Sequence, residues 1–535
     1  MVLEKTYFDP VEKIWSGPVV PSLFHPDASI GMVLEFVMNR RKDKPSQIFE
    51  STGDIWTYYK FHKTAIKIAR TFLEKKITQD DIIGICASNT PFVPAVAVAA
   101  FLIGTPISTL DPSFDKEGIH HIFGITQPSI LFCDRAIVEK VQSAFTEINL
   151  ECDIYVVDET DGEGTIEEFL LEREDDDSFK ALPLKYGGDQ TAAILCSSGS
   201  TGLPKGVTIS HHALINCGFF SVEANDRLLS FSTLYWLSGL ITLYLGIFHG
   251  GCRILINKPF SSDLLIDTIE KLKVSFIIGP PSQMALLVQN DRAVKADLSS
   301  LKNYFVGGSA VPFQVIEKLR KIIPNCYIRV GYGMTEICGT CCSGPPSGPN
   351  ANGFVKQNNK VKIVDDNGNK LGIGETGEIL IQTISKWNGY YKNQKATDEA
   401  LDNGWVKSGD LGYFDKEGNF FVVDRKKEIL KFKNFHYFPT EIELVILDLP
   451  DVIEVCVCGL PDLVMTDLPA ALVVKRPESN LKEKDIIDYV SEKMADFKHL
   501  RGGVYFVDNI PKTASGKNVR KKVKELVIQL SGIKV

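Results

Sequence analysis

The sequence has no segment typical of a membrane span or a secretion signal. No run of about 18 uncharged apolar residues, the length that a transmembrane helix needs, occurs in the 535 residues. Residues 1–17 carry Asp, Glu and Lys and lack the apolar core of a signal peptide. The final Ile533–Val535 does not match the Ser-Lys-Leu peroxisomal address. We expect an intracellular protein without a transmembrane segment, either cytoplasmic or peroxisomal.

Basic charge and disulfide spacing are also lacking. The net charge is -8 and the pI about 5.7, which argues against the strongly basic surface of a nucleic-acid-binding protein. The 12 cysteines show no disulfide-framework spacing, which favours a reducing compartment. The single C-x-x-C, Cys338–Cys341, has no second pair and no nearby His, so it predicts buried thiols instead of a zinc site.

The first part of the chain alternates helical patterns with short apolar runs. Such alternation is typical of α/β organisation with a largely parallel sheet. The acidic stretch Glu172–Asp177 predicts a solvated loop. The predicted helices are Thr64–Glu74, Val93–Leu102 and Val311–Ile322, and the predicted strands are Ile82–Ala87, Ser129–Cys133, Ile154–Val157, Arg253–Ile256 and Ser275–Ile278.

The pattern of predicted elements changes in the last third of the chain. From Lys360 onward, short strands alternate with Asp/Asn/Gly turns, which favours a β-rich subdomain beginning near residue 350. A compact α+β pattern follows Lys427. We therefore predict an α/β fold class: a large N-terminal domain over 1–426, made of two α/β subdomains and the β-rich subdomain, and a small C-terminal domain over 427–535.

A Gly/Ser/Thr loop is the most informative local feature. It follows the apolar run Ala192–Cys196, which predicts a strand. Glycines let backbone N–H groups approach an anion closely, hydroxyls add donors and a lysine adds positive charge, so the loop predicts phosphate binding. The spacing fails the Walker A pattern, because Pro204 stands where that pattern needs glycine. The candidate phosphate ligands are Ser197, Ser198, Gly199, Ser200, Thr201, Gly202 and Lys205.

The loop Ser198–Gly206 resembles the phosphate loop of the adenylate-forming superfamily, which includes acyl-CoA synthetases, insect luciferases and peptide-synthetase adenylation domains. Further motifs of that family follow in order, so the resemblance covers roughly residues 20–530. Gly331–Glu336 places an aromatic ring between glycines, able to stack on a base, and a Thr-Glu pair able to hold a hydrated cation. The resemblance implies Tyr332 against adenine and Glu336, with Thr201, near Mg²⁺.

Three more segments extend the implied nucleotide site. Gly307–Ala310 is similar to the adenine-side loop of the family, and Trp405–Gly412 to the motif whose Asp410 accepts the ribose hydroxyls. In Val423–Glu428 the resemblance implies that Arg425 contacts the nucleotide and that Lys427 is the pivot of a mobile C-terminal domain. The implied nucleotide-binding residues in this part of the chain are Gly308, Ser309, Ala310, Gly331, Tyr332, Gly333, Met334, Thr335, Asp410 and Arg425.

The last motif, Pro511–Lys517, implies that Lys517 is the adenylation lysine, which acts on ATP with Lys205, Thr335 and Glu336. Attack of a carboxylate on the α-phosphorus concentrates negative charge, so catalysis depends on positioning and a positive field. In the second step of the family's reaction, the C-terminal domain rotates so that another of its faces enters the active site. The implied CoA-side residues are Lys431, Lys433, Asn434 and Phe435, with Asn434 where the family usually has glycine.

Taken as a whole, the sequence most resembles insect luciferases and their non-luminous acyl-CoA synthetase relatives. Beetle luciferases carry a His-His-Gly-Phe segment in the luciferin pocket, and here the two histidines are replaced by Tyr235 and Trp236. Gly339 stands where those luciferases commonly have serine. Both departures argue against light emission with beetle luciferin. The candidate acyl pocket consists of Tyr235, Trp236, Ser238, Gly307 and Gly339.

The leading hypothesis is therefore an ATP-dependent acyl-CoA ligase for a fatty or aryl carboxylate. ATP, CoA and a small carboxylic acid would be its substrates and Mg²⁺ its cofactor, and we expect a monomer. A luciferase that oxidises a luciferin adenylate, a non-catalytic binding protein and an adenylation domain serving a carrier protein are the alternatives.

Overall fold

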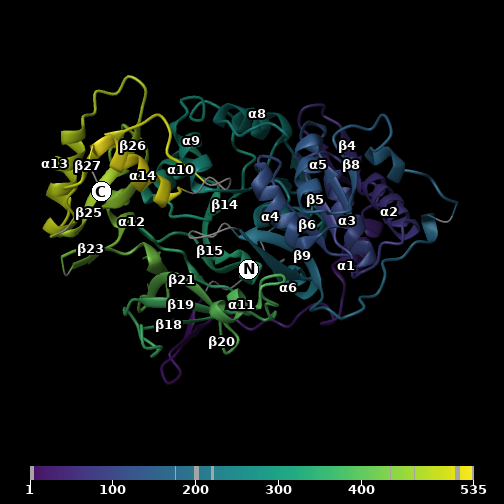
Figure 1. The fold of residues 1–535 in the computed structure, drawn as a ribbon, viewed down its shortest axis with the longest axis horizontal. Helices are drawn as coiled ribbons and strands as arrows, with labels where there is room; N and C mark the ends of the chain where they lie inside the picture. Colours follow the sequence, from purple (N-terminus) through teal and green to yellow (C-terminus); the bar gives the residue numbers. More distant parts are fainter. Residues whose placement is uncertain are drawn as a thin grey trace.

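The computed structural model describes residues 5–174, 176–197, 204–217, 222–433, 435–462, 464–512 and 518–532, with the side chains of 197 and 436 excepted. Over these ranges the strands form sheets of seven, six, nine and five strands (Figure 1). The first three sheets make up the N-terminal lobe, and the five-stranded sheet with its helices makes up the C-terminal lobe. In the same described ranges, none of the helices has both the length and the apolar character that crossing a bilayer requires.

The six-stranded sheet is parallel except where β10 pairs with β9. Its strands are β5 (Ile83–Cys86), β6 (Ile107–Thr109), β7 (Ile130–Cys133), β8 (Asp153–Val156), β9 (Thr191–Ser197) and β10 (Lys205–Ser210). Helices α2 (Tyr58–Glu74), α3 (Val93–Ile103), α4 (Lys116–Thr126) and α5 (Val138–Glu147) belong to this part of the chain. Every residue of helix α3 is buried, which explains why its sequence is apolar on all sides. Gly104 ends the helix in the left-handed conformation (φ 77°).

The nine-stranded sheet has a parallel centre and antiparallel edges, in the order β17-β16-β15-β14-β13-β11-β12-β3-β4. Its strands are β3 (Pro45–Phe49), β4 (Ile55–Thr57), β11 (Arg227–Leu229), β12 (Cys252–Leu255), β13 (Phe276–Gly279), β14 (Asn303–Gly307), β15 (Tyr327–Met334), β16 (Gly339–Gly344) and β17 (Phe354–Val355). Helices α7 (Leu237–Phe248), α8 (Ser262–Leu272), α9 (Pro281–Gln289) and α10 (Phe313–Ile322) belong to this part of the chain. Helix α1 (Ile30–Arg40) packs against α3 and α7, and α6 (His211–Cys217) packs against β10 of the six-stranded sheet. One large apolar cluster joins α1, α2, α3 and α7 with strands of both α/β sheets.

The predicted α/β elements are confirmed. The expected helix Thr64–Glu74 is the C-terminal part of α2, and the strands predicted over 82–87 and 129–133 are β5 and β7, which begin one residue later. Short 3-10 helices complete the described elements: η1 (Arg135–Ile137), η2 (Ile166–Phe169), η3 (Asp176–Ser178), η4 (Thr335–Ile337), η5 (Lys426–Glu428) and η6 (Asp496–Lys498).

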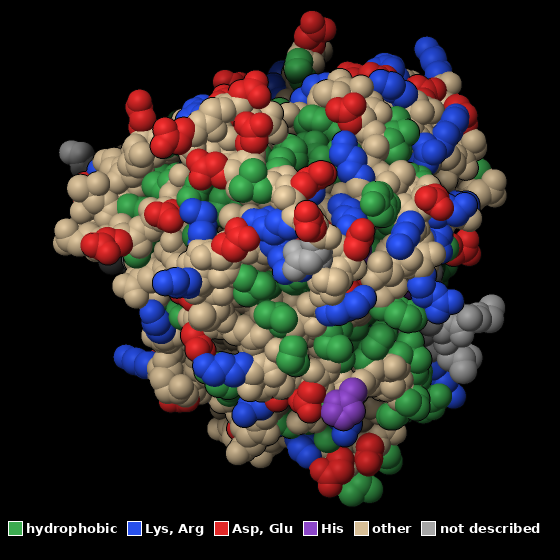
Figure 2. Space-filling view, turned by 90° about the vertical axis from the view of Figure 1, so that its right-hand side faces the viewer, with side chains coloured by type: hydrophobic (Ala, Val, Ile, Leu, Met, Phe, Trp, Pro, Cys, Tyr) green, Lys and Arg blue, Asp and Glu red, His purple; other side chains and the backbone are tan. Residues whose placement is uncertain are grey.

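In the acidic stretch predicted as a solvated loop, Glu172, Glu174 and Asp177 are exposed, and Asp176 alone of the described acidic residues is buried. Asp176 is 5% exposed, accepts a hydrogen bond from the backbone N–H of Arg173 and lies 3.9 Å from Arg70. Glu172 pairs with Lys67 of α2 at 2.9 Å. The stretch is held because α2 presents basic side chains to it, which sequence distance conceals. Figure 2 shows the side of the molecule that includes this region, where acidic and basic side chains are interspersed.

The β-rich sheet follows β17 of the nine-stranded sheet, and its strands resume at Lys360, where the pattern of the sequence changes. Its edge is a hairpin from the start of the chain. Its strands are β1 (Tyr7–Asp9), β2 (Ile14–Ser16), β18 (Lys360–Val364), β19 (Gly377–Gln382), β20 (Leu401–Asp402), β21 (Trp405–Phe414) and β22 (Phe420–Arg425), with helix α11 at Gln394–Ala400. Sequence reasoning missed the hairpin because its partner strand lies far along the chain.

The C-terminal lobe has its own apolar cores on the two faces of its sheet. Its strands are β23 (Leu430–Phe432), β24 (Phe435–Tyr437), β25 (Val452–Asp462), β26 (Thr466–Lys475) and β27 (Gly503–Phe506). Its helices are α12 (Pro439–Ile446), α13 (Glu483–Lys493) and α14 (Arg520–Ser531). Separate cores let the lobe keep its structure if it moves as a body.

Trp15 fastens the N-terminal hairpin to the β-rich sheet, so its removal should destabilise the N-terminal lobe. The indole is 1% exposed and stacks on Phe8 and Phe414 with centroid distances of 4.6 Å each. We expect Trp15→Ala to lower the free energy of unfolding by about 3–5 kcal/mol, the usual cost of emptying a buried aromatic site. Denaturant unfolding measures this loss. Leu23→Ala, at a position 73% exposed, is the control and should change little, and an unshifted midpoint for Trp15→Ala would contradict the assignment.

Candidate active site

Asp410 is held by side chains from two sheets. It lies on β21 opposite Arg425 of β22, and the Arg425 Nε is 3.4 Å from its Oδ1. The Tyr332 hydroxyl, on β15 of the nine-stranded sheet, donates to its Oδ2 at 2.7 Å. The backbone N–H of Asp410 donates to Ser408 Oγ at 3.0 Å. Burial and the neighbouring carboxylate raise the pKa of Tyr332 well above its ordinary value, so its hydroxyl stays a proton donor.

A second polar group forms around Glu336. Its Oε1 accepts a hydrogen bond of 2.8 Å from the hydroxyl of Tyr390, and the carboxyl group is largely buried. Lys205 Nζ lies 4.7 Å from the centre of the Tyr390 ring, an arrangement typical of a cation–π contact. Burial, reinforced by the charge of Glu336, raises the pKa of Tyr390. The phosphate-loop lysine and the predicted metal-side glutamate therefore share one aromatic ring.

Tyr390 is a site residue that sequence reasoning missed. It is placed by backbone pairing with the first strand after the phosphate loop: Val207 forms a bridge with Tyr390, and the Tyr391 N–H donates to the Gly206 carbonyl at 2.7 Å. The signal in the sequence is weak, because the segment 389–391 carries no motif that points to this contact.

The glycines of the second motif permit close approach of backbone to backbone. A Cβ at Gly333 would lie 1.9 Å from the carbonyl oxygen of Gly339 on the antiparallel partner β16. Gly308 has φ 96°, a conformation that favours glycine, and it turns the chain away from the end of β14. Gly308, Ser309 and Ala310 are exposed there, beside the end of β15. Carboxyl ends of parallel strands are the usual position of ligand sites in α/β sheets.

Several predicted site residues lie outside the described part of the chain. Of Ser197, only the backbone in β9 is described. The remaining predictions outside the described ranges are Ser198, Gly199, Ser200, Thr201, Gly202, Asn434 and Lys517.

Comparison with known proteins agrees with this arrangement of motifs. The family model named AMP-binding enzyme matches residues 34–391, and that of the AMP-binding enzyme C-terminal domain matches residues 441–517. The chain belongs to the AMP-binding, adenylate-forming enzymes.

Among the relatives of this family member, a probable 4-coumarate–CoA ligase of Dictyostelium discoideum is 30% identical over 524 residues, covering 92% of this chain and 95% of the relative. A luciferin 4-monooxygenase of Luciola mingrelica is 30% identical over 541 residues, covering 96% and 98%. The crystal structure of the anthranilate CoA ligase AuaEII in complex with anthranoyl-AMP superposes with a TM-score of 0.87 at 20% identity, covering 95% of this chain and 99% of that one. That likeness shows the shared fold.

The residues around Glu336 fit the magnesium ion that this family implies. Mg²⁺ binds oxygen ligands, usually through one or two carboxylates, and keeps several of its waters. In the described ranges no three His, Cys, Asp or Glu side chains gather as a dedicated metal cage, and Mg²⁺ bound with a nucleotide does not need one. A single buried carboxylate oriented by Tyr390 suits such an ion, and the hydroxyl of Thr335 is adjacent in sequence.

The residues predicted for the acyl pocket are divided between two places. Tyr235 is 3% exposed and packs with Phe114 and Trp236 in the apolar cluster of the six-stranded sheet. Ser238 donates to Ser232 Oγ at 2.7 Å. Within the described part of the chain, Gly339 alone of the predicted pocket residues lines a cavity of about 40 Å³ beyond η4. Their roles in substrate binding remain predictions.

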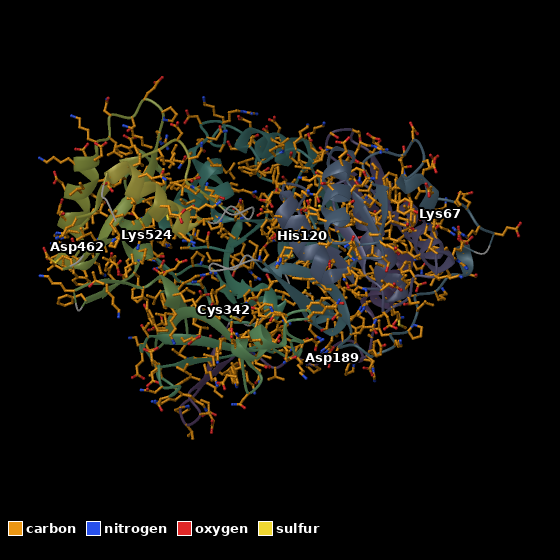
Figure 3. All side chains as sticks on the ribbon, in the orientation of Figure 1. Lys67, His120, Asp189, Cys342, Asp462 and Lys524 are labelled. Carbon is orange, nitrogen blue, oxygen red and sulfur yellow. The ribbon has the colours of Figure 1, made fainter. Side chains whose placement is uncertain are left out.

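The cysteines near Gly339 are buried thiols, as predicted. Cys338, Cys341 and Cys342 are unpaired and buried. A hydrogen bond with Cys217 and burial raise the pKa of Cys338, and burial raises that of Cys342, so both stay protonated. Cys342, labelled in Figure 3, belongs to the apolar cluster where β16 meets the seven-stranded sheet.

The predicted pivot at Lys427 lies between residues tied to different lobes. Lys426 Nζ is 2.9 Å from Glu378 of β19 in the N-terminal lobe. Glu428 is 3.0 Å from Arg520 of α14 in the C-terminal lobe. Lys427 itself is exposed. This arrangement supports a pivot at Lys427, since the residues on each side are held by different bodies.

The described CoA-side residues, Lys431, Lys433 and Phe435, lie away from the predicted nucleotide site. Lys431 is the central residue of β23, Phe435 begins β24, and Lys433 after β23 has φ 55°. Figure 1 shows β23 on the side of the C-terminal lobe that is remote from β15, whereas α10 of the N-terminal lobe lies against the lobe through a Gln314–Asp448 hydrogen bond. The hairpin would have to move to reach the site around Asp410.

Asp424, next to the pivot, should make stability depend on pH. Its Oδ2 accepts from the Thr440 N–H of α12 at 3.1 Å, and its Oδ1 from the Arg425 N–H at 2.7 Å. Burial raises the pKa of Asp424 from 3.8 to about 6. Protonation therefore favours the folded state, and this contribution is present in acid and lost as the pH rises through about 6. The difference between the two pKa values corresponds to about 3 kcal/mol.

Denaturant unfolding of the wild type and Asp424→Asn between about pH 4 and pH 8 measures this effect. We expect the stability of the wild type, relative to the variant, to fall by up to about 3 kcal/mol as the pH rises through about 6. Asp508→Asn, at an exposed position, should follow the wild type at every pH. Parallel curves for the wild type and Asp424→Asn would contradict the raised pKa.

Proposed function

We propose that the protein is an AMP-forming acyl-CoA ligase. It would convert a fatty or aryl carboxylic acid to an acyl-adenylate with ATP and Mg²⁺, and then to an acyl-CoA thioester. The observation that carries the proposal is a pair of linked polar groups at the end of β15. Tyr332 on the strand is bound to Asp410, and Glu336 on the following 3-10 helix η4 is bound to Tyr390 beside Lys205. Of these side chains, Tyr332, Asp410, Glu336 and Lys205 are the ones that the family motifs assign to the nucleotide, its phosphates and the metal.

In the first step a carboxylate oxygen bonds to the α-phosphorus of ATP while the bond to the β-phosphate breaks and pyrophosphate leaves. Asp410 would accept the ribose hydroxyls, and Tyr332 and Arg425 would hold that carboxylate in place. Lys205 and Lys517 would stabilise the negative charge that grows on the phosphates. When bound, Mg²⁺ supplies further positive charge to the phosphate oxygens, and Glu336 would hold it.

In the second step the CoA sulfur attacks the acyl carbonyl carbon, the bond from that carbon to AMP breaks and the thiol proton is released. Rotation about Lys427 would withdraw Lys517 and bring the Lys431 hairpin to the site. The names of the relatives include both CoA ligases and luciferin monooxygenases. The ligase is favoured because the pocket histidines of beetle luciferases are replaced here, and Tyr235 packs into an apolar core.

Pyrophosphate release tests the proposal directly. We expect the enzyme with Mg-ATP to release pyrophosphate with one class of carboxylic acid and to form a thioester when CoA is added. Light emission with candidate luciferins, above that of a Lys517→Ala control, would favour the luciferase alternative. Release of pyrophosphate without a thioester would contradict the second step, and no release with any acid would contradict the whole proposal.

Two lysine variants should separate the two steps. Lys517→Ala is expected to lower the rate of adenylate formation by roughly 100-fold or more, because it removes a charge that acts on the transition state, and to spare transfer from a supplied acyl-adenylate to CoA. Lys431→Ala should do the reverse. Single-turnover assays of each half-reaction measure both rates. Equal loss of both steps in either variant would refute the assigned roles.

A further inference from the structure

Tyr390 lies outside the motifs from which the nucleotide site was predicted, yet its backbone is held from two sides. Its N–H donates to the Thr397 hydroxyl of α11 at 2.9 Å. The carbonyl of Gly389 accepts from the Thr208 hydroxyl of β10 at 2.7 Å. Gly389 has φ 93°, and a Cβ there would lie 2.3 Å from the Thr397 side chain, so this close approach requires glycine. The position of Tyr390 is therefore fixed between β10 and α11.

The side chain of Tyr390 contacts two charges of opposite sign. Its hydroxyl donates to Glu336 Oε1 at 2.8 Å, and Lys205 Nζ lies 4.7 Å from the centre of its ring. The face of an aromatic ring attracts a cation, whereas the phenolic O–H is a donor suited to a carboxylate. Trp387 packs against the same ring in a T-shaped arrangement, with 4.9 Å between the centroids. The ring is thus held in place while it contacts both the lysine and the glutamate.

The backbone on both sides of Lys205 is also held. The Pro204 carbonyl accepts from Nε2 of His121 on α4 at 2.8 Å, and the Gly206 carbonyl accepts from the Tyr391 N–H at 2.7 Å. What remains to be positioned is the lysine side chain, whose four-carbon stem is flexible. An ammonium group that acts at one point must be ordered by a contact, and the ring of the neighbouring tyrosine supplies one.

Glu336 has a similar freedom. The terminal torsion of a glutamate is broad, so its carboxylate can turn unless a donor holds one of its oxygens. Burial, reinforced by the charge of Glu336, raises the pKa of Tyr390, which keeps the hydroxyl protonated as that donor. A buried contact of this kind fixes geometry more than it stabilises the fold, because desolvation of the carboxylate offsets much of the gain. Packing accounts for an aromatic ring at position 390 but not for its hydroxyl.

We propose that Tyr390 is a positioning residue of the adenylation step. Its hydroxyl orients Glu336 and its ring face places Lys205, so that both side chains are already arranged when the ATP phosphates and their cation bind. Charges that are arranged before the reaction stabilise a transition state more effectively than charges that must move during it. The inference rests on the proposed function, since it adds a residue to the same reaction.

Two substitutions of Tyr390 separate the two contacts. Tyr390→Phe removes the hydroxyl and keeps the ring face, whereas Tyr390→Leu removes both. We expect Tyr390→Phe to lower kcat/KM for ATP in pyrophosphate release by roughly 10-fold, the effect of one hydrogen bond to a charged group. Tyr390→Leu should lower it by a further factor of roughly 3 to 10, because the cation–π contact is lost as well. Tyr59→Phe, which removes a hydroxyl at a position 50% exposed on α2, is the control and should behave as the wild type.

Double-mutant cycles identify the partner of each contact. The loss caused by Tyr390→Phe should shrink by roughly 3-fold or more when Glu336→Gln is already present, because the hydroxyl then meets a neutral amide. The same loss should be unchanged in Lys205→Met, and Tyr390→Leu should be coupled to both partners. The dissociation constant of Mg-ATP, measured by calorimetry without any acid, should show the same pattern and does not depend on turnover.

Additive effects in every pair, in both turnover and Mg-ATP binding, would overturn the inference and leave Tyr390 as a packing residue. The same conclusion would follow if Tyr390→Phe kept the wild-type kcat/KM, or if it lowered the midpoint of denaturant unfolding while kcat/KM and the dissociation constant stayed unchanged. Absence of pyrophosphate release with every acid would instead overturn the proposed function, and the cycles of Mg-ATP binding would then decide separately whether Tyr390 positions Glu336 and Lys205.

Discussion

The contact on which the N-terminal lobe depends is the one that Asp410 makes with Tyr332 and Arg425. Asp410 and Arg425 are cross-strand partners at one end of the β21–β22 pair, and Tyr332 belongs to another sheet. A slip of one residue in that pair would turn Asp410 to the other face and break both contacts. The register of one strand pair therefore aligns two sheets at the point where the chain leaves for the C-terminal lobe.

The Glu336 group joins the remaining sheet to the same place. Val207, in the strand after the phosphate loop, pairs with Tyr390, whose hydroxyl reaches Glu336 at the end of β15. Three sheets thus meet at this place through hydrogen bonds and an ion pair, in addition to the apolar cluster that both α/β sheets share. Polar links of this kind fix geometry more than they stabilise, because the desolvation of a carboxylate offsets much of what its partners contribute.

At the junction between the lobes, neighbouring charged side chains form ion pairs with different lobes. Lys426 is tied to β19 and Glu428 to α14, and Asp424 accepts from the start of α12. A rotation at Lys427 can leave the first two ion pairs intact, whereas the contact of Asp424 with Thr440 must change. A few kilocalories per mole at Asp424 would then influence how the two lobes sit together, since allosteric and gating equilibria are shifted by energies of that size.

The sequence by itself determined the local elements and the order of the motifs. Apolar runs of strand length and the all-apolar helix at 93–103 follow from short-range periodicity, and the Gly/Ser/Thr loop and Gly331–Glu336 are contiguous. Tertiary structure alone decided the placement of the 7–16 hairpin and of Tyr390 beside Glu336, because each depends on a partner far along the chain. The burial of Asp176 near Arg70 of α2 belongs to the same class, because the helix that supplies the opposite charge lies far along the chain.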